Sequence, residues 1–226
     1  MAGDPSRPGA APDYLLTTIE AGSVWARIYP HTLPGIPVVD PLFFGPGAGN
    51  PPSSRFDDPG PGAAHPEAPP LDAGARPDVG RFGVCYLGTT PEAAFVETFL
   101  RRAGRPGRTV IGAADREARR LATAEVRRPV RLVDLRGPGL ARAQLDAGVT
   151  TIRDYAWPQA VARVLWRDAA GVDGIVYHAR HDPTCHAVAL FDRARDALAV
   201  RHVERLDADL SRLLAWADQY GCTMLF

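Results

Sequence analysis

Lysine is absent from the 226-residue chain, so all 26 basic side chains are arginine. The protein therefore has no P-loop lysine, no Schiff-base lysine and no kinase-type lysine, and enzyme classes that depend on those groups are excluded. Basic and acidic residues balance to a net charge of zero. No overall electrostatic field attracts the chain to nucleic acid or to an anionic membrane, and we expect neither as a partner.

Long hydrophobic runs and an even set of cysteines are also lacking. No apolar stretch approaches the roughly 18–20 residues that cross a bilayer, and the start, MAGDPSRPGAAPDY, lacks the apolar core of a signal peptide. Cys85, Cys185 and Cys222 are odd in number and far apart, which favours free thiols in a reduced compartment. We therefore expect a cytoplasmic protein, whose 46% hydrophobic content is ordinary for a globular domain.

Glycine and proline concentrate in the first third of the chain, where residues 1–80 hold 27 of the 44. The alternating stretch SVWARIY (23–29) is the strand predicted in this region. We assign 1–22 to an N-terminal tail and 23–226 to one domain. A Pro/Gly-rich insertion at about 58–80 interrupts this domain, and we expect it to be partly mobile because long irregular segments are usually functional loops or disordered.

The pattern becomes regular after residue 81. Short strands are predicted at 109–113, 131–135, 174–179 and 186–192. Helical spacing of apolar residues predicts helices at 91–103, about 138–147, 157–170 and 207–220. Because strands and helices do not alternate as regular βαβ units, we predict an α+β fold with mixed, mostly antiparallel sheets and flanking helices.

The segment HARHDPTCH (178–186) places His178, His181, Cys185 and His186 close together. Zinc usually takes two pairs of ligands from separate elements, and no second cluster exists in the sequence. We therefore predict no metal site. His178 and His186 are instead expected to lie in two strands on either side of a turn at Asp182-Pro183.

Residues 101–131 carry ten arginines against Asp115, Glu117 and Glu125. This excess of positive charge is not interleaved with aromatic residues, and no helix-turn-helix or RNA-binding signature accompanies it. We interpret the run as a solvated face or as a surface for an acidic protein partner.

The stretch RFGVCYLGTTPEAAFVETFLRR (81–102) predicts a strand, a turn and a helix. Thr90 is a suitable helix cap, and Pro91 fits the first helical position, where a missing N–H costs nothing. Glu97 falls just outside the apolar arc of this helix. A carboxylate at that border is an unusual feature for a helix that packs on a core.

Several blocks, in order, resemble the RES domain over roughly residues 23–220: SRFDDP, FGVCYLGTTPEAAFVETFLRR, RLVDLRGPGL, DGIVYHARHD and HAVALFDRA. The family is named for an arginine, a glutamate and a serine, and it includes toxins of bacterial toxin–antitoxin pairs. The resemblance implies a fold like that of the ADP-ribosyltransferase toxins. It also implies consumption of NAD⁺, by phosphorolysis or hydrolysis, with no cofactor beyond this substrate and with inorganic phosphate as a co-substrate in phosphorolysis.

By this resemblance Arg27 and Arg55 would hold the phosphates of the dinucleotide, as the planar guanidinium fork suits phosphate oxygens. Tyr86 would flank the cationic nicotinamide. Glu97 would hydrogen-bond the nicotinamide ribose and stabilise its developing positive charge. Arg27, Tyr86 and Glu97 are thus the expected catalytic residues, and the position of Glu97 beside the apolar face is explained if it lines a cleft.

The sequence departs from the family where its serine precedes the arginine of the Y-x-S-R block, because here Ala179 precedes Arg180. We count Arg180 and His178 among the cofactor-binding residues, with His178 or Ser54 as substitutes for the missing hydroxyl. The implied partners are NAD⁺, an Xre-like antitoxin and a second copy of the chain. Two alternatives stay open: ADP-ribosylation of a protein, and a catalytically weakened binding module.

Overall fold

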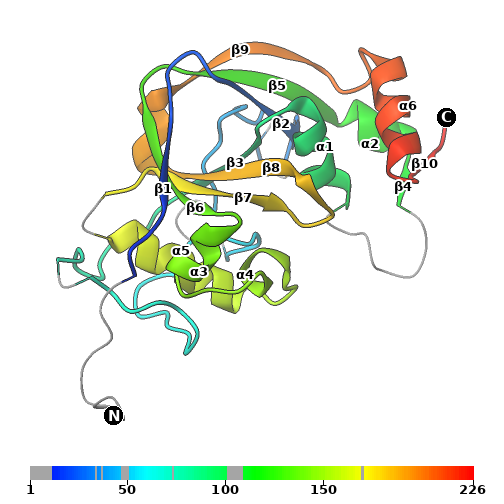
Figure 1. Cartoon of the computed structure of the whole chain (residues 1–226). Helices are drawn as coiled ribbons and strands as arrows, with labels where there is room; N and C mark the ends of the chain where they lie inside the picture. Colours follow the sequence, from blue (N-terminus) through cyan, green and yellow to red (C-terminus); the bar gives the residue numbers. More distant parts are fainter. Residues whose placement is uncertain are drawn as a thin grey trace.

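The fold is described from a computed structural model, which defines residues 12–33, 35–36, 38–46, 51–72, 74–100, 109–168 and 171–226. Its centre is an eight-stranded sheet with the order β1-β6-β7-β8-β3-β2-β5-β9 (Figure 1). The strands of this sheet are β1 (Leu16–Ile19), β2 (Val24–Pro30), β3 (Val84–Gly88), β5 (Arg119–Val126), β6 (Val130–Leu135), β7 (Gly174–Ala179), β8 (Asp182–Phe191) and β9 (Leu198–Arg205).

Every neighbouring pair in this sheet is antiparallel except β6–β7, which is parallel. A separate small parallel pair joins β4 (Val110–Ile111) to β10 (Thr223–Met224). The helices are α1 (Pro91–Phe99), α2 (Ala113–Glu117), α3 (Pro138–Arg142), α4 (Gly148–Thr151), α5 (Ala156–Arg167), α6 (Leu210–Gln219) and the 3-10 turn η2 (Asp192–Ala197). The predicted class, α+β with a mostly antiparallel sheet and flanking helices, is confirmed.

Both faces of the sheet are covered, but by different material. Helices α3, α4 and α5 gather beside β6 and β7 in Figure 1, where Val161 and Leu165 of α5 pack with Ile175 of β7. Helices α1 and α6 cover the same face further along, over Ile28 and Leu121. The opposite face is closed by η2 and by the turn around residues 42–44. Burial of these apolar side chains is the main favourable term in the stability of the fold.

Most predicted elements appear, with shifted ends. The strands predicted at 23–29, 131–135 and 174–179 match β2, β6 and β7, while the strand at 186–192 belongs to the longer β8. The strand at 109–113 shrinks to β4 because α2 begins at Ala113. The predicted helices correspond to α1, α3, α5 and α6, each shorter than expected; residues 101–103 and 169–170 of two of them lie outside the described part.

Two assignments from the sequence need correction. Residues 16–19, placed in an N-terminal tail, form β1 and pair with Val130–Val133 of β6. Residues 119–126, interpreted as part of a solvated basic face, form β5, and Leu121, Ala122, Ala124 and Val126 are buried there. The interpretation was wrong because Arg119 and Arg120, which stand before the buried positions, made the stretch look exposed. Residues 101–108 of the arginine run lie outside the described residues.

The Pro/Gly-rich stretch 58–80 contains turns, and within its described residues it has no helix or strand. Both of its ends are nonetheless bonded to α5, through Asp58 and Asp78. The C-terminal tail packs on the domain, with Cys222 and Met224 against the core. The three cysteines are free thiols. Across the described ranges, no helix is long and apolar enough to span a membrane.

Candidate active site

A cavity of about 810 Å³ opens between β2, β3, α1 and the irregular segment that precedes β3. This volume is within the range of small-molecule sites, about 300–1,000 Å³. Five of the predicted site residues line it: Arg27, Arg55, Tyr86, Glu97 and Arg180. They come from four separate parts of the chain, so the fold itself brings them together. Their chemical roles stay predictions.

Helix α1 carries Glu97 into this cavity because its start is fixed. The Thr90 hydroxyl oxygen accepts a hydrogen bond from the Ala93 N–H at 3.0 Å, and Pro91 occupies the first turn, as predicted. The helix also lies directly on the end of β3, where a Cβ on Gly88 would meet the Ala94 nitrogen at 2.3 Å. Only glycine permits this approach, which sets the depth at which Glu97 enters the pocket.

Tyr177 of β7 is a site residue to which the sequence interpretation assigned no role. It is 1% exposed, and its hydroxyl donates a hydrogen bond to Glu97 Oε2 at 3.2 Å. Its ring packs edge-on against Phe56, with ring centroids 5.1 Å apart. A buried phenol with a fixed ring therefore restrains the carboxylate. The tyrosine of the DGIVYHAR block is the signal that could have identified it.

The hydroxyl of Tyr86 is fully engaged in the pocket wall. It donates to Asp57 Oδ1 at 3.0 Å and accepts from the Phe56 N–H at 2.8 Å. Burial of the hydroxyl, followed by the nearby Asp57 carboxylate, raises the Tyr86 pKa well above its usual value. The phenol is thus held neutral and is not a proton donor to a ligand, so the ring is the part of Tyr86 that a ligand in the cavity can use.

Asp57 fixes the loop that carries Arg55. The carboxylate is buried, and its Oδ2 accepts the N–H groups of Ser53 and Ser54 at 2.8 and 2.7 Å. The Arg55 guanidinium donates to the Ile152 carbonyl at 2.9 Å and lies 5.2 Å from the centroid of the Tyr155 ring. Sequence reasoning did not identify Asp57, although it stands in the SRFDD motif.

Arg27 lines the cavity from β2 and also ties down a turn. Its Nη1 donates to the carbonyls of Pro41 and Phe43, at 3.1 and 2.8 Å, and contacts Cys85 Sγ at 3.3 Å. Strands β2 and β3 pair at one position only, Ala26 with Gly88. Arg27 therefore bridges the two strands beside the pocket by its side chain.

One end of the cavity collects positive charge. The cations Arg55 and Arg180 line it beside His181, whose lowered pKa leaves its imidazole neutral near pH 7, and Arg153 is close enough to influence both Arg180 and His181. Burial, followed by the neighbouring charges of Arg55 and Arg153, lowers the pKa of Arg180. Burial also lowers the pKa of His181, and the charges of Arg180, Arg153 and Arg55 lower it further. The buried Nε2 of His181 has no hydrogen-bond partner among the described residues. Like charges held together in this way favour binding of an anion.

His178 is not brought to the cavity, which corrects its assignment as a cofactor-binding residue. Successive strand residues point to opposite faces, so His178 lies away from Tyr177, and its ring is 5.2 Å from that of His186 across β7–β8. Ala179 is buried against Ala93 and Val96 of α1 and does not line the cavity. Ser54, the other substitute considered for the missing serine, is in the lining.

His178 and His186 lie opposite each other in the β7–β8 pair. Across the described ranges, no group of three or more histidine, cysteine or acidic side chains is arranged to hold an ion. His186 Nδ1 lies 3.0 Å from Arg136 Nη1, and because arginine only donates, that nitrogen accepts. His186 is therefore bonded to Arg136, and His178 contacts His186 through its ring.

Comparison with known proteins gives matches of three kinds: a family model, a curated relative and solved structures. The family model described as RES domain matches residues 25–211. A protein named "Probable toxin y4kH", from Sinorhizobium fredii (strain NBRC 101917 / NGR234), is 31% identical over 101 residues, which are 45% of this chain and 79% of that protein. A chain from the crystal structure of the M. tuberculosis MbcT–MbcA toxin–antitoxin complex aligns with a TM-score of 0.49 and 20% identity, over 87% of this chain and 91% of its own.

Proposed function

Since the chain belongs to the RES domain family, we propose that it is an enzyme that consumes NAD⁺ by cleaving the bond between nicotinamide and ribose. The observation that carries the proposal is the position of Glu97. Its carboxylate is restrained by Tyr177 and lines a cavity that also contains Arg27, Arg55 and Arg180. A carboxylate and guanidinium groups in one cavity suit the ribose and the diphosphate of a nicotinamide dinucleotide.

The chemistry requires one fixed carboxylate. Cleavage of the nicotinamide–ribose bond develops an oxocarbenium-like ribose, as in glycoside hydrolysis. A carboxylate such as Glu97, held beside C1′ of this ribose, stabilises the transition state more than the ground state and so raises the rate. Nicotinamide departs neutral, taking the bonding electron pair, so no acid is needed. A neutral Tyr86 phenol bonded to Asp57 agrees with this requirement.

The other lining residues bind the rest of the substrate. Arg55 and Arg27 are suited to the diphosphate, because guanidinium groups offer paired donors to phosphate oxygens. The Tyr86 ring is suited to the cationic nicotinamide, since aromatic faces attract cations by roughly 0.5–2 kcal/mol. These assignments are part of the proposal.

The cationic end of the cavity favours inorganic phosphate over water as the attacking group. Arg180 and His181 lie beside Arg55, with Arg153 near enough to depress their pKa values. A phosphate oxygen would form a bond to C1′ as the bond to nicotinamide breaks, giving nicotinamide and an ADP-ribose 1″-phosphate. With water, the products would be nicotinamide, ADP-ribose and a proton.

The Sinorhizobium relative bears the name of a probable toxin, and an enzyme that depletes NAD⁺ would arrest growth. We therefore propose that this chain is the toxin of a toxin–antitoxin pair, neutralised by an Xre-like antitoxin. Growth arrest on expression of the wild-type chain, relieved by co-expression of its antitoxin and absent in Glu97→Gln, is the expected result.

The proposed reaction is tested by incubating the purified chain with NAD⁺, with and without inorganic phosphate, and measuring nicotinamide and the sugar product by chromatography. We expect nicotinamide release that is stimulated by phosphate, and its loss in Glu97→Gln, with the fold retained as judged by circular dichroism. Nicotinamide release that occurs without phosphate, and that added phosphate does not stimulate, would assign hydrolysis. Labelling of an added protein by ADP-ribose would favour a transferase, and binding of NAD⁺ without turnover a binding module.

A further inference from the structure

The irregular segment before β3 is attached to α5 along most of the helix. The Trp157 Nε1 donates to the Glu67 carbonyl at 2.9 Å, and Gln159 Nε2 donates to the Ser54 carbonyl at the same distance. One turn later Arg163 reaches both ends of the 58–80 stretch. Helix α5 therefore holds this segment through Ser54, Asp58, Glu67 and Asp78.

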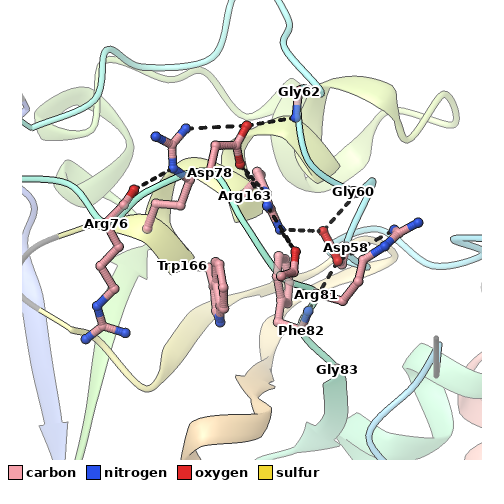
Figure 2. Close-up of polar contacts among 12 residues, drawn as sticks. Asp58, Gly60, Gly62, Arg76, Asp78, Arg81, Phe82, Gly83, Arg163 and Trp166 are labelled. Carbon is pink, nitrogen blue, oxygen red and sulfur yellow. Dashed lines mark hydrogen bonds and ion pairs between the residues drawn. The ribbon is translucent and has the colours of Figure 1, made fainter.

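Figure 2 shows Arg163 between two carboxylates. Its Nη1 lies 3.1 Å from Asp58 Oδ1, and its Nη2 lies 2.7 Å from Asp78 Oδ1. The Gly80 carbonyl accepts two further bonds from it, both at 3.2 Å. Arg163 and Asp58 are each 1% exposed. A buried charge needs nearly complete pairing, so this arrangement tolerates little displacement.

Asp57 and Asp58 are neighbours in sequence, but their carboxylates bond to different groups. Asp58 also accepts the N–H groups of Gly60 and Phe82, at 2.9 and 3.2 Å, and so closes the segment onto itself. Asp57 accepts the Tyr86 hydroxyl and the N–H groups of Ser53 and Ser54, and these three partners line the cavity. Fixing Asp58 to α5 therefore fixes Asp57 and the residues it orients.

Arg55 is held by the same helix from a second direction. Gln159, a buried residue of α5, bonds the carbonyl of Ser54, the residue before Arg55. The Arg55 guanidinium is bonded to Ile152 and lies over Tyr155, both just before α5 begins. We propose that α5 positions Arg55 and Tyr86 in the pocket. Gln159 is the positioning residue, because it bonds the residue before Arg55, and Arg163 attaches the following segment to the helix.

This inference rests on the proposed function for its kinetic consequence only. Placement of a binding group within a fraction of an ångström is needed for efficient binding, and small displacements cost on the order of tenfold to a hundredfold. Loss of the Gln159 bond frees Ser54 and lets Arg55 drift from the phosphate oxygens. We therefore expect Gln159→Met to raise KM for NAD⁺ about tenfold and to change kcat by less than about threefold.

Trp157→Phe is the matched control. It removes one hydrogen bond of the same length from the same helix to the same segment, but at Glu67, a residue outside the cavity lining. Because Trp157 is also buried in the core, this variant is destabilised at least as much as Gln159→Met. A rise in KM for Gln159→Met alone supports positioning. An equal rise in both variants, or none in Gln159→Met, overturns it.

Hydrogen exchange decides the inference even if the protein does not cleave NAD⁺. The amides of Ser53, Ser54 and Phe56 are bonded to Asp57 and to the Tyr86 hydroxyl. We expect these amides to exchange at least tenfold faster in Gln159→Met and at an unchanged rate in Trp157→Phe. Unchanged exchange at all three amides in Gln159→Met would overturn the proposal. Absence of NAD⁺ cleavage in the wild type would overturn only the proposed reaction.

Discussion

Replacing Tyr177 with phenylalanine removes a single hydroxyl group that faces Glu97. The ring, which is buried and packed edge-on against Phe56, keeps its contacts, so the fold should survive the change. What is lost is the hydrogen bond of 3.2 Å to Glu97 Oε2. This variant therefore tests the orientation of the carboxylate separately from its presence.

The size of the effect follows from the chemistry of the bond. A hydrogen bond to a charged group contributes about 1.5–3 kcal/mol, and each 1.36 kcal/mol in the barrier changes the rate tenfold. If the whole bond serves to hold Glu97 beside the ribose, kcat falls roughly 10- to 150-fold. KM for NAD⁺ should change little, because the arginines that bind the phosphates are elsewhere in the cavity.

The assay is single-turnover release of nicotinamide, with Tyr220→Phe as the control. The Tyr220 hydroxyl also lies within hydrogen-bond distance of two carboxylates, 2.8 Å from Glu92 Oε1 and 2.7 Å from Asp182 Oδ2, and its single proton is shared between them; Tyr220 does not line the cavity. We expect slow turnover in Tyr177→Phe and a normal rate in Tyr220→Phe. An unchanged rate in Tyr177→Phe would refute the view that the phenol orients the catalytic acid.

Three further predictions concern Arg180 and its neighbours in sequence, Ala179 and Asp182. Arg180→Met should raise KM for phosphate about tenfold without lowering the melting temperature, because repulsion from Arg55 and Arg153 is relieved; a normal phosphate response measured by nicotinamide release would contradict it. Ala179→Ser should leave turnover equal or higher and lower stability by about 1 kcal/mol in urea titrations, since a hydroxyl enters an apolar cluster; a sharp loss of turnover would show that the family serine does not align here. Hydrogen bonds from Thr184 and then Tyr220 lower the Asp182 pKa to about 2 in the folded state. Because this is below the value in the unfolded chain, about 3.9, the stabilisation is complete above that pH and is lost as pH falls towards 2. Asp182→Asn should flatten this part of the stability curve in acid unfolding, and an unaltered curve would exclude the assignment.

The sequence was most informative where function depends on local structure. Thr90, Pro91 and the apolar spacing of α1 predicted the helix and the border position of Glu97, because capping and periodicity act within a few residues. The convergence of Arg27, Arg55, Tyr86 and Glu97 was expected from family resemblance, since no local rule brings residues from separate segments into one cavity.

Other features escaped prediction for identifiable reasons. His178 was misplaced because its side of β7 depends on strand register, which the sequence does not reveal. Strand β5 was hidden by Arg119 and Arg120, which flank its buried positions. Asp57, Tyr177 and Gln159 act through partners 29, 80 and 105 residues away, so their roles become visible only in the folded chain.

The most direct test of the account is a crystal structure of Glu97→Gln soaked with NAD⁺. We predict that the nicotinamide ribose lies against residue 97 and beside Tyr86, with the diphosphate between Arg27 and Arg55. A dinucleotide bound outside this cavity, or a ribose remote from residue 97, would contradict the claim that this acid and these arginines form one NAD⁺ site.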